Sequence, residues 1–414
     1  MRARTQRMLR GTWGVTLAAT MLAWGAATAV GQDGVPGSIP KEGDQEVVRP
    51  DVPLRLARED VGTAIDKGVA YLIRKQKPDG SWGDDAPKML ELGFALNTYR
   101  SWRIASHGIT CMALAAVDET PERKGALRRA VRFLCETKLP RRDSDWDIDY
   151  VWTSLYGFSS AVELLGDARF QAGGSMAGLR EPLLTRAREF LQVLVQHQAG
   201  TGGWAYYDDP PFNAQPTWAT SFCTALVLPA LHGAPAIGIE IPPKVKERAL
   251  RYLNRCVLPN GAYTYDLDPT PRIGGVEHIN KIEGSLGRTQ VGNWARAVLG
   301  DRRVTPDVMK EGLDALFQHH RFLDHVRLRP IPHEGFHANA GYFYFFAHYY
   351  ASRVINLLPP EEREEYHARL RPHLVKTQRK SGAASDFLGS SYTVNAGTSF
   401  LVLSLQEGLD QAKN

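Results

Sequence analysis

Two histidines stand four residues apart in a pattern that can bind a metal ion. Residues 333–337 read His-Glu-Gly-Phe-His, so His333 and His337 would share one face if the segment were helical. Both imidazoles could then bind zinc, and Glu334 could act as the base for a zinc-bound water. Gly335 and the prolines before it weaken a helix here. The segment is either a metal or ligand site at a cavity rim, or a polar loop leading into the next helix.

Aromatic side chains gather at or near the starts of several apolar segments. Their faces could bind an apolar ligand, or stabilise a carbocation by cation–π contacts worth roughly 0.5–2 kcal/mol each. The alternative is that they belong to the hydrophobic core, which is the usual place for aromatic residues at helical spacing. Some polar side chains would lie near the same rim. The candidate ligand-binding residues are Tyr150, Trp152, Trp218, Trp294, Tyr342, His107 and Arg288.

The elements that must position these residues repeat along the chain. Residues 67–82 (KGVAYLIRKQKPDGSW) align without a gap with residues 248–263 (RALRYLNRCVLPNGAY). Partial copies of the pattern are found at 129–134, 190–204 and 373–382, and a degenerate copy lies near residue 315. The copies recur about every sixty residues, a period typical of repeat architectures. The spacing therefore predicts six units.

Each unit also holds a second segment that is apolar on nearly all sides, which predicts a buried helix. The first segment of each unit is more charged and more amphipathic, which suits an outer helix. Six such pairs can close into a ring that buries every inner helix and leaves no uncapped end. The sequence thus predicts an all-α fold, an (α/α)6 toroid of six outer/inner helix pairs. An open solenoid is the alternative.

The repeated segment resembles the QW repeat of terpenoid cyclases and protein prenyltransferases, which are α/α toroids. The matching positions are Lys67, Gly68, Tyr71, Leu72, Gln76, Gly80 and Trp82. The resemblance extends over about residues 60–410. In that family the glutamine caps a neighbouring helix and the tryptophan stacks at the turn. The resemblance therefore implies a structural role for Gln76, Gly80 and Trp82, and for Gln198, Gly202 and Trp204.

The same resemblance draws attention to an acidic turn. Class II cyclases of the family protonate an alkene with an aspartic acid of a D-x-D-D motif, and this chain has Asp147-Ile148-Asp149-Tyr150 before an inner helix. The resemblance implies that Asp147 and Asp149 are the catalytic acid pair. Tyr150 replaces the fourth aspartate of the motif, and the chain has one barrel where class II cyclases have two. The alternative is a solvated turn in which Asp149 caps the following helix.

Three hypotheses for function follow. The first is an isoprenoid cyclase or transferase that holds an apolar small molecule in a central cavity. The second is a non-catalytic toroid that binds a ligand or a protein partner. The third is a glycan-active toroid, which needs two carboxylates about 5–10 Å apart across the cavity. The sequence leaves the cofactor unknown, because neither a D-D-x-x-D motif nor the zinc ligands of prenyltransferases can be placed.

The N-terminal segment has the features of an export signal. Residues 1–31 combine a basic start, an apolar stretch and an A-x-A cleavage site, which predicts a Sec-type signal peptide. A membrane anchor is the alternative. Residues 32–57 are polar and rich in proline and glycine, which predicts a flexible leader, and residues 58–414 form one toroid domain. The expected location is periplasmic or extracellular.

Charge and cysteine content narrow the partners further. The chain carries 50 basic and 45 acidic residues, and four of the basic ones are arginines in residues 1–31. The remaining balance of 46 to 45 gives no support for a nucleic acid or an anionic membrane as partner. No later stretch is long enough and apolar enough to be an integral membrane span. The four cysteines could pair as 111–135 and 223–256, or remain buried free thiols.

Overall fold

The computed structural model describes residues 56–84, 96–142, 147, 149–207, 215–267, 279–329, 336–386 and 392–410. Residues 52–414 form one compact unit. Within the described residues the regular structure is helical, with three isolated β-bridges and no strand. None of the described helices has the length and apolarity that crossing a membrane requires. The predicted signal peptide lies outside the described residues, as does the leader up to residue 55, so both stay predictions.

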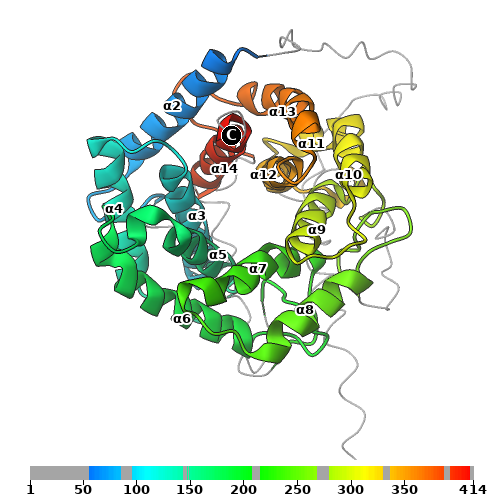
Figure 1. Cartoon of the computed structure of the whole chain (residues 1–414), viewed down its shortest axis with the longest axis horizontal. Coiled ribbons are helices and arrows are strands. Elements are labelled where there is room, and N and C mark those ends of the chain that lie inside the picture. Colours follow the sequence, from blue (N-terminus) through cyan, green and yellow to red (C-terminus); the bar gives the residue numbers. More distant parts are fainter. Residues whose placement is uncertain are drawn as a thin grey trace, which may run out of the picture. The chain divides into compact units, whose positions relative to one another are not determined.

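Six charged helices form the outer layer of this unit (Figure 1). Their sequences bury one stripe each: in the fourth, Val245, Ala249, Tyr252 and Leu253 are buried, a spacing that places them on one helical face. Proline occupies one of the first two positions of four of these helices, where its missing N–H costs nothing. The outer helices are α2 (Arg58–Lys75), α4 (Pro121–Glu136), α6 (Arg180–Gln196), α8 (Pro243–Arg255), α10 (Pro306–Gln318) and α13 (Pro360–Val375).

Six largely apolar helices form the inner layer, and most of their residues are buried. The inner helices are α3 (Leu96–Ala115), α5 (Trp152–Gly166), α7 (Ser221–Gly233), α9 (Leu286–Val298), α12 (Phe343–Ile355) and α14 (Tyr392–Asp410). Each packs against the inner helix before it and the one after it, and the last of them, α14, packs against the first, α3. The ring is therefore closed. The predicted (α/α)6 toroid is confirmed, and the open solenoid is wrong.

Glutamine side chains tie neighbouring outer helices together at three turns. Gln76 Nε2 donates to Ala126 O of α4 at 2.9 Å and to Gly80 O at 3.1 Å. Gln198 makes the equivalent bonds to Val245 O of α8 at 2.9 Å and to Gly202 O at 2.7 Å. A third glutamine, Gln378, joins the last outer helix to the first through Ala64 O of α2 at 2.8 Å. These bonds give the glutamines the helix-linking role expected from the sequence.

The tryptophans of the same turns bind back to their own outer helix. Trp82 Nε1 donates to Leu72 O, and Trp204 Nε1 donates to Leu194 O, each at 2.7 Å. Both indoles are buried. In the fourth unit Val257 stands at the position that glutamine occupies in these three turns, and it pairs with Tyr263 in a short β-bridge instead.

The four cysteines are free thiols. Cys111, Cys223 and Cys256 are buried, and Cys135 is half-buried. Burial raises the pKa of the Cys256 thiol to about 11, so this group stays protonated and behaves as a small apolar side chain.

Candidate active site around Asp149

Asp149 occupies a strained turn that leads into α5. Its φ of 59° lies in the left-handed region, which aspartate tolerates better than most residues with a Cβ. The N-terminal cap residue of α5 is Val151, and no side chain caps this helix. The carboxylate instead accepts a hydrogen bond from Trp102 Nε1 of α3 at 3.0 Å. The capping role considered from the sequence is therefore not the one that Asp149 plays.

The surroundings of Asp149 favour its protonated form. Burial raises the pKa of the carboxyl to about 7, although the hydrogen bond from Trp102 opposes this rise by stabilising the carboxylate. Burial raises the pKa of Tyr206 and of Tyr342, and the negative charge of Asp149 adds to both rises, which places both phenols within electrostatic reach of the carboxyl. Asp149 is half-buried, so part of the residue remains accessible. Near neutral pH this carboxyl can give or take a proton, as a general acid must.

Aromatic rings from several units pack together beside this carboxyl. Trp152 stacks on Tyr156 with ring centroids 5.6 Å apart, and on Tyr206 at 6.2 Å. Trp218 meets the Tyr206 ring edge-on at 5.0 Å. The Tyr206 and Tyr265 hydroxyls lie 2.9 Å apart. We call these side chains and their ring-contact neighbours the aromatic cluster: Trp152, Tyr156, Tyr206, Trp218, Phe222, Tyr265 and Phe343.

The line of contacting aromatics continues away from Asp149 and ends at a charged group. Burial raises the pKa of the Tyr156 phenol, the nearby Tyr350 adds to this rise, and the ring of Tyr350 lies 5.2 Å from that of Trp294. The guanidinium of Arg353 covers Trp294 at 5.2 Å and forms an ion pair with Glu407 at 2.6 Å. Trp294 thus belongs to this second, charged end.

The other ligand-binding candidates divide between these surroundings and the outer layer. Trp152 and Trp218 are members of the aromatic cluster, and Tyr342 packs on its Phe343 at 4.6 Å. Arg288 lies over the Tyr265 ring at 5.6 Å, while its Nε donates to Tyr263 O at 3.2 Å.

Two candidates lie elsewhere. The ring of Tyr150 packs against His197 at the end of α6, at 5.4 Å. His107 is enclosed between Trp82 and Phe133, where its Nε2 donates to Ala130 O at 2.9 Å. Burial lowers the pKa of His107 to about 4, which keeps its ring neutral.

The remaining site predictions concern Asp147 and the two histidines of the zinc-like motif. Asp147 is buried, with 3% of its surface exposed. His333 lies outside the described residues, so the predicted metal pair stays a prediction. His337 has a φ of 58° and lies in the short 3-10 helix η6 (Phe336–Ala338), ahead of α12.

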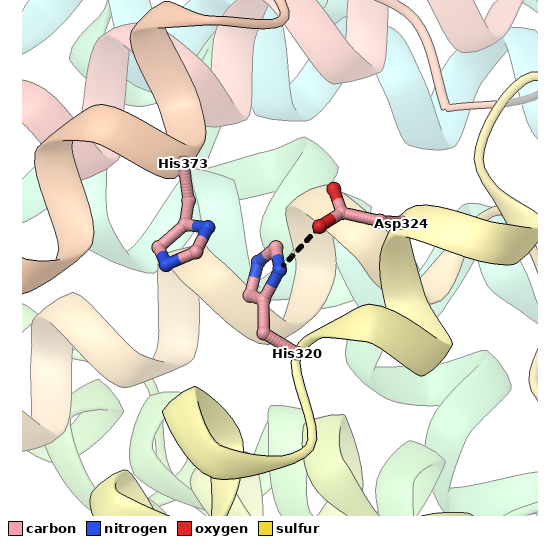
Figure 2. A group of neighbouring side chains, drawn as sticks. All are labelled: His320, Asp324 and His373. Carbon is pink, nitrogen blue, oxygen red and sulfur yellow. Dashed lines mark hydrogen bonds and ion pairs between the residues drawn. The ribbon is translucent and has the colours of Figure 1, made fainter. Parts of the chain in front are cut away.

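A different group of histidines does come together within the described residues (Figure 2). His320, Asp324 and His373 offer ligand atoms that all lie within 4.8 Å of one another. Asp324 belongs to the short helix α11 (Arg321–Val326) and His373 to α13. His320 Nδ1 lies 2.9 Å from Asp324 Oδ2, and its Nε2 lies 2.9 Å from His348 Nε2 of α12.

Lys376 already supplies a positive charge to this group. Lys376 Nζ lies 3.0 Å from both oxygens of Asp324 and 3.4 Å from His373 Nδ1, which is where a metal ion would have to bind them. The rings of His320 and His373 also stack, with centroids 3.6 Å apart. We interpret the group as a structural tie between α11, α12 and α13.

Sequence reasoning missed the side chains that define the surroundings of Asp149. Trp102 is the hydrogen-bond partner of Asp149, yet it lies 47 residues away on another inner helix. Tyr206 and Tyr265 come from loops that precede α7 and α9. A Tyr-Tyr pair at 206–207 directly after the third repeat was the one available signal. It could not be read as a site because the contacts of Tyr206 with Trp152 and Tyr265 join segments that are more than fifty residues apart.

Comparison with known proteins supports the fold. No known family profile matches the chain, and no curated protein matches it. A solved α-1,6-mannanase from Salegentibacter is 12% identical, covering 84% of this chain and 99% of its own, with a TM-score of 0.52.

Two further solved structures are similar at the same level. A family 76 glycoside hydrolase from a bovine Bacteroides thetaiotaomicron strain is 11% identical over 84% of this chain and 78% of its own, with a TM-score of 0.52. A type II terpene cyclase from Scytonema is 13% identical over 85% and 99%, with a TM-score of 0.48. At these identities the likeness concerns the fold alone, and the chain has the α/α toroid architecture.

Proposed function

We propose that this chain is an exported, terpenoid cyclase-like toroid that binds an apolar isoprenoid against the aromatic cluster and protonates it with Asp149. The observation that carries the proposal is a carboxyl whose pKa burial raises to about 7, beside aromatic rings from several units. An acid in this setting keeps its proton near neutral pH. The rings beside it supply an apolar surface against which a polyene can pack.

The residues present can carry a complete proton cycle. Asp149 gives its proton to one carbon of a double bond, which leaves a carbocation on the neighbouring carbon and a carboxylate on Asp149. The Trp102 N–H stabilises that carboxylate, and the faces of Trp152 and Tyr206 stabilise the cation. Ring closure or a shift moves the cation, and loss of a proton to water then gives an isomer of the substrate. A proton from water returns Asp149 to its acid form.

Conversion of a polyene tests this proposal directly. The purified protein is incubated with squalene or with geranylgeraniol, and the products are identified by gas chromatography and mass spectrometry. We expect an isomeric product, and we expect Asp149→Asn to abolish it because an amide cannot donate this proton. Asp118→Asn, on an exposed turn outside the aromatic cluster, is the matched control and should retain full activity.

Three results would contradict the proposal. Unchanged turnover in Asp149→Asn would show that Asp149 is not the proton donor. Tight polyene binding without conversion in any variant would instead support the non-catalytic binding toroid. Release of reducing sugar from a glycan, lost in Asp149→Asn, would support the glycan-active toroid, in which the same raised pKa would serve a general acid.

A further inference from the structure

A second site lies at the junction of the first two units. A cavity of about 620 Å³ opens between α3 and the turns that follow α2 and α4. A neighbouring cavity of about 450 Å³ shares Asp79, Phe133 and Thr137 with it, so the two form one continuous groove. None of the described lining residues belongs to the aromatic cluster. The groove is of the size that small-molecule ligands occupy.

The larger cavity concentrates positive charge. Among the described residues that line it, four are basic, namely Arg100, Arg103, Lys138 and Arg141, and one is acidic, Asp79. Arg100, Lys138 and Arg141 are exposed, and the structure gives them no ion pair within its described ranges. Elsewhere in the chain arginines commonly find a carboxylate. Arg303 pairs with Asp301 at 2.7 Å, and Arg369 pairs with Asp314 at 2.7 Å.

This excess does not follow from the composition of the chain. The sequence after residue 31 carries nearly equal numbers of basic and acidic residues. Like charges held around one cavity repel each other and lower the stability of the fold, unless an anion binds between them. The position of the three exposed cations, Arg100, Lys138 and Arg141, therefore points to a ligand that carries negative charge.

The walls of the groove are held in place by buried contacts. Arg103 donates to Trp82 O through Nε and a terminal nitrogen, at 3.3 and 3.2 Å. On the other side Arg186 of α6 donates to Thr137 O at 2.9 Å, which fixes the turn that carries Lys138 and Arg141. The ring of His107 lies 4.8 Å from that of Phe133, and both line the cavity. The site is preformed, which lowers the entropy cost of binding.

We infer that this groove is a binding site for a multivalent anion, a small ligand that carries phosphate or carboxylate groups. Guanidinium groups bind both kinds of oxygen through paired N–H donors, and Lys138 adds a point charge. The site is independent of the proposed function of Asp149. Phosphate esters and acidic oligosaccharides share the required chemistry, and the experiment separates these two sources.

Titration calorimetry at low ionic strength tests the inference with two probes, inorganic pyrophosphate and trigalacturonate. The site variant combines Arg100→Gln, Lys138→Gln and Arg141→Gln, all on exposed side chains, so the fold should survive. The control combines Lys244→Gln, Arg302→Gln and Lys380→Gln. These three residues are also exposed and lie outside the groove, and their substitution removes the same total charge. Circular dichroism confirms that both variants are folded.

We expect one of the two probes to bind the unmodified protein with one-to-one stoichiometry. Binding of pyrophosphate would indicate a phosphate ester as the ligand, and binding of trigalacturonate would indicate an acidic oligosaccharide. The site variant should lose at least about tenfold in affinity, because it removes three cationic side chains that would bind the anion by charged hydrogen bonds. The control should change by less than about twofold. Absence of binding by both probes would overturn the inference. So would an equal loss in both variants, because it would reflect the total charge alone.

Discussion

At the scale of single residues, Asp149 combines an unusual backbone with an unusual acid. Its left-handed φ of 59° sets the carboxyl beside Trp102, and burial raises its pKa to about 7. The two features are coupled, because a carboxyl in the ordinary helix-capping position would be stabilised as a carboxylate by backbone N–H groups. The turn therefore keeps Asp149 available as an acid.

The raised pKa predicts how stability depends on pH. Unfolded aspartate has a pKa of about 3.9, so between that value and about 7 the folded protein binds a proton that the unfolded chain has lost. The stability contributed by the buried acid is complete below pH 4 and is lost as the pH rises through 7. Asp149→Asn cannot ionise, so its free energy of unfolding should rise relative to the parent protein between pH 4 and pH 8.

Urea denaturation at pH 4.5, 6 and 8 measures this difference. Asp118→Asn, on an exposed turn, should show no trend with pH. A difference between Asp149→Asn and the parent that stays constant from pH 4.5 to 8 would mean that the native carboxyl titrates in its ordinary range.

The group of His320, Asp324 and His373 gives a second prediction at this scale. Burial would raise the pKa of Asp324, but the hydrogen bond to His320 and the charge of Lys376 hold it below its usual value. Since Lys376 already neutralises Asp324, we expect EDTA and added zinc to leave the melting temperature unchanged. Purified protein that carries one equivalent of zinc by atomic emission spectroscopy, and loses it in His373→Ala, would contradict this interpretation.

At the scale of the elements, three glycines allow the turns that contain them to pack closely against the next outer helix. Gly80, Gly202 and Gly382 have φ values of 89°, 105° and 92°. A Cβ on any of them would overlap a backbone carbonyl of the neighbouring helix, that of Arg129 for Gly80. These carbonyls belong to helices that the glutamines also bind, so each turn has a fixed distance to its neighbour.

The fourth unit provides the matched control for this contact. Gly261 has a φ of 80°, but a Cβ there would meet nothing within 4 Å. Gly261→Ala should cost about 1–2 kcal/mol for its backbone conformation alone. Gly80→Ala should cost a further 1–3 kcal/mol, approximately, for the overlap with Arg129 O. Denaturant unfolding of both variants measures the difference, and equal losses would show that the turns do not rest on their neighbours.

The contacts of the repeated glutamine turns could be predicted from sequence, but those of the units that depart from the repeat could not. Gln76, Gln198 and Gln378 recur with a glycine four residues later, so their shared role could be expected. The fifth unit departs from this pattern, because His320 and its partners make the contacts there. The sequence of that unit matches the repeat poorly, and the network draws on α11, α12 and α13, whose proximity no local pattern encodes.

At the scale of the molecule, the ring is closed by contacts between the chain's first and last units. Gln378 Nε2 donates to Ala64 O at 2.8 Å, and Ser399 Oγ donates to Thr110 Oγ1 at 2.9 Å. These bonds join segments about 300 residues apart, so the unit should unfold as one cooperative body. An open array would fray from either end.

Ring closure predicts a shared response at two distant helices. Gln378→Ala should increase amide hydrogen exchange in both α2 and α13, because it removes the bond between them. Gln198→Ala, which breaks the equivalent bond in the middle of the chain, should affect α6 and α8. Faster exchange in α13 alone after Gln378→Ala would argue against a closed ring.

The fold and the site differ in how far sequence could predict them. The toroid follows from one local pattern of charged helix, turn and apolar helix, repeated about every sixty residues. The acid was also visible as Asp147-x-Asp149 before α5. Its pKa was not, because the neighbours that set it, Trp102 of α3 and the rings of the aromatic cluster, come together only when the ring closes.

The protonation state of Asp149 is the property on which the proposed chemistry rests. A carbon-13 NMR titration of protein labelled at the aspartate carboxyl carbons measures it, with Asp149→Asn used to assign the signal. The structure predicts a midpoint at about pH 7. A midpoint near pH 4, the value of an ordinary exposed aspartate, would mean that Asp149 is a carboxylate at neutral pH and would contradict its role as the acid.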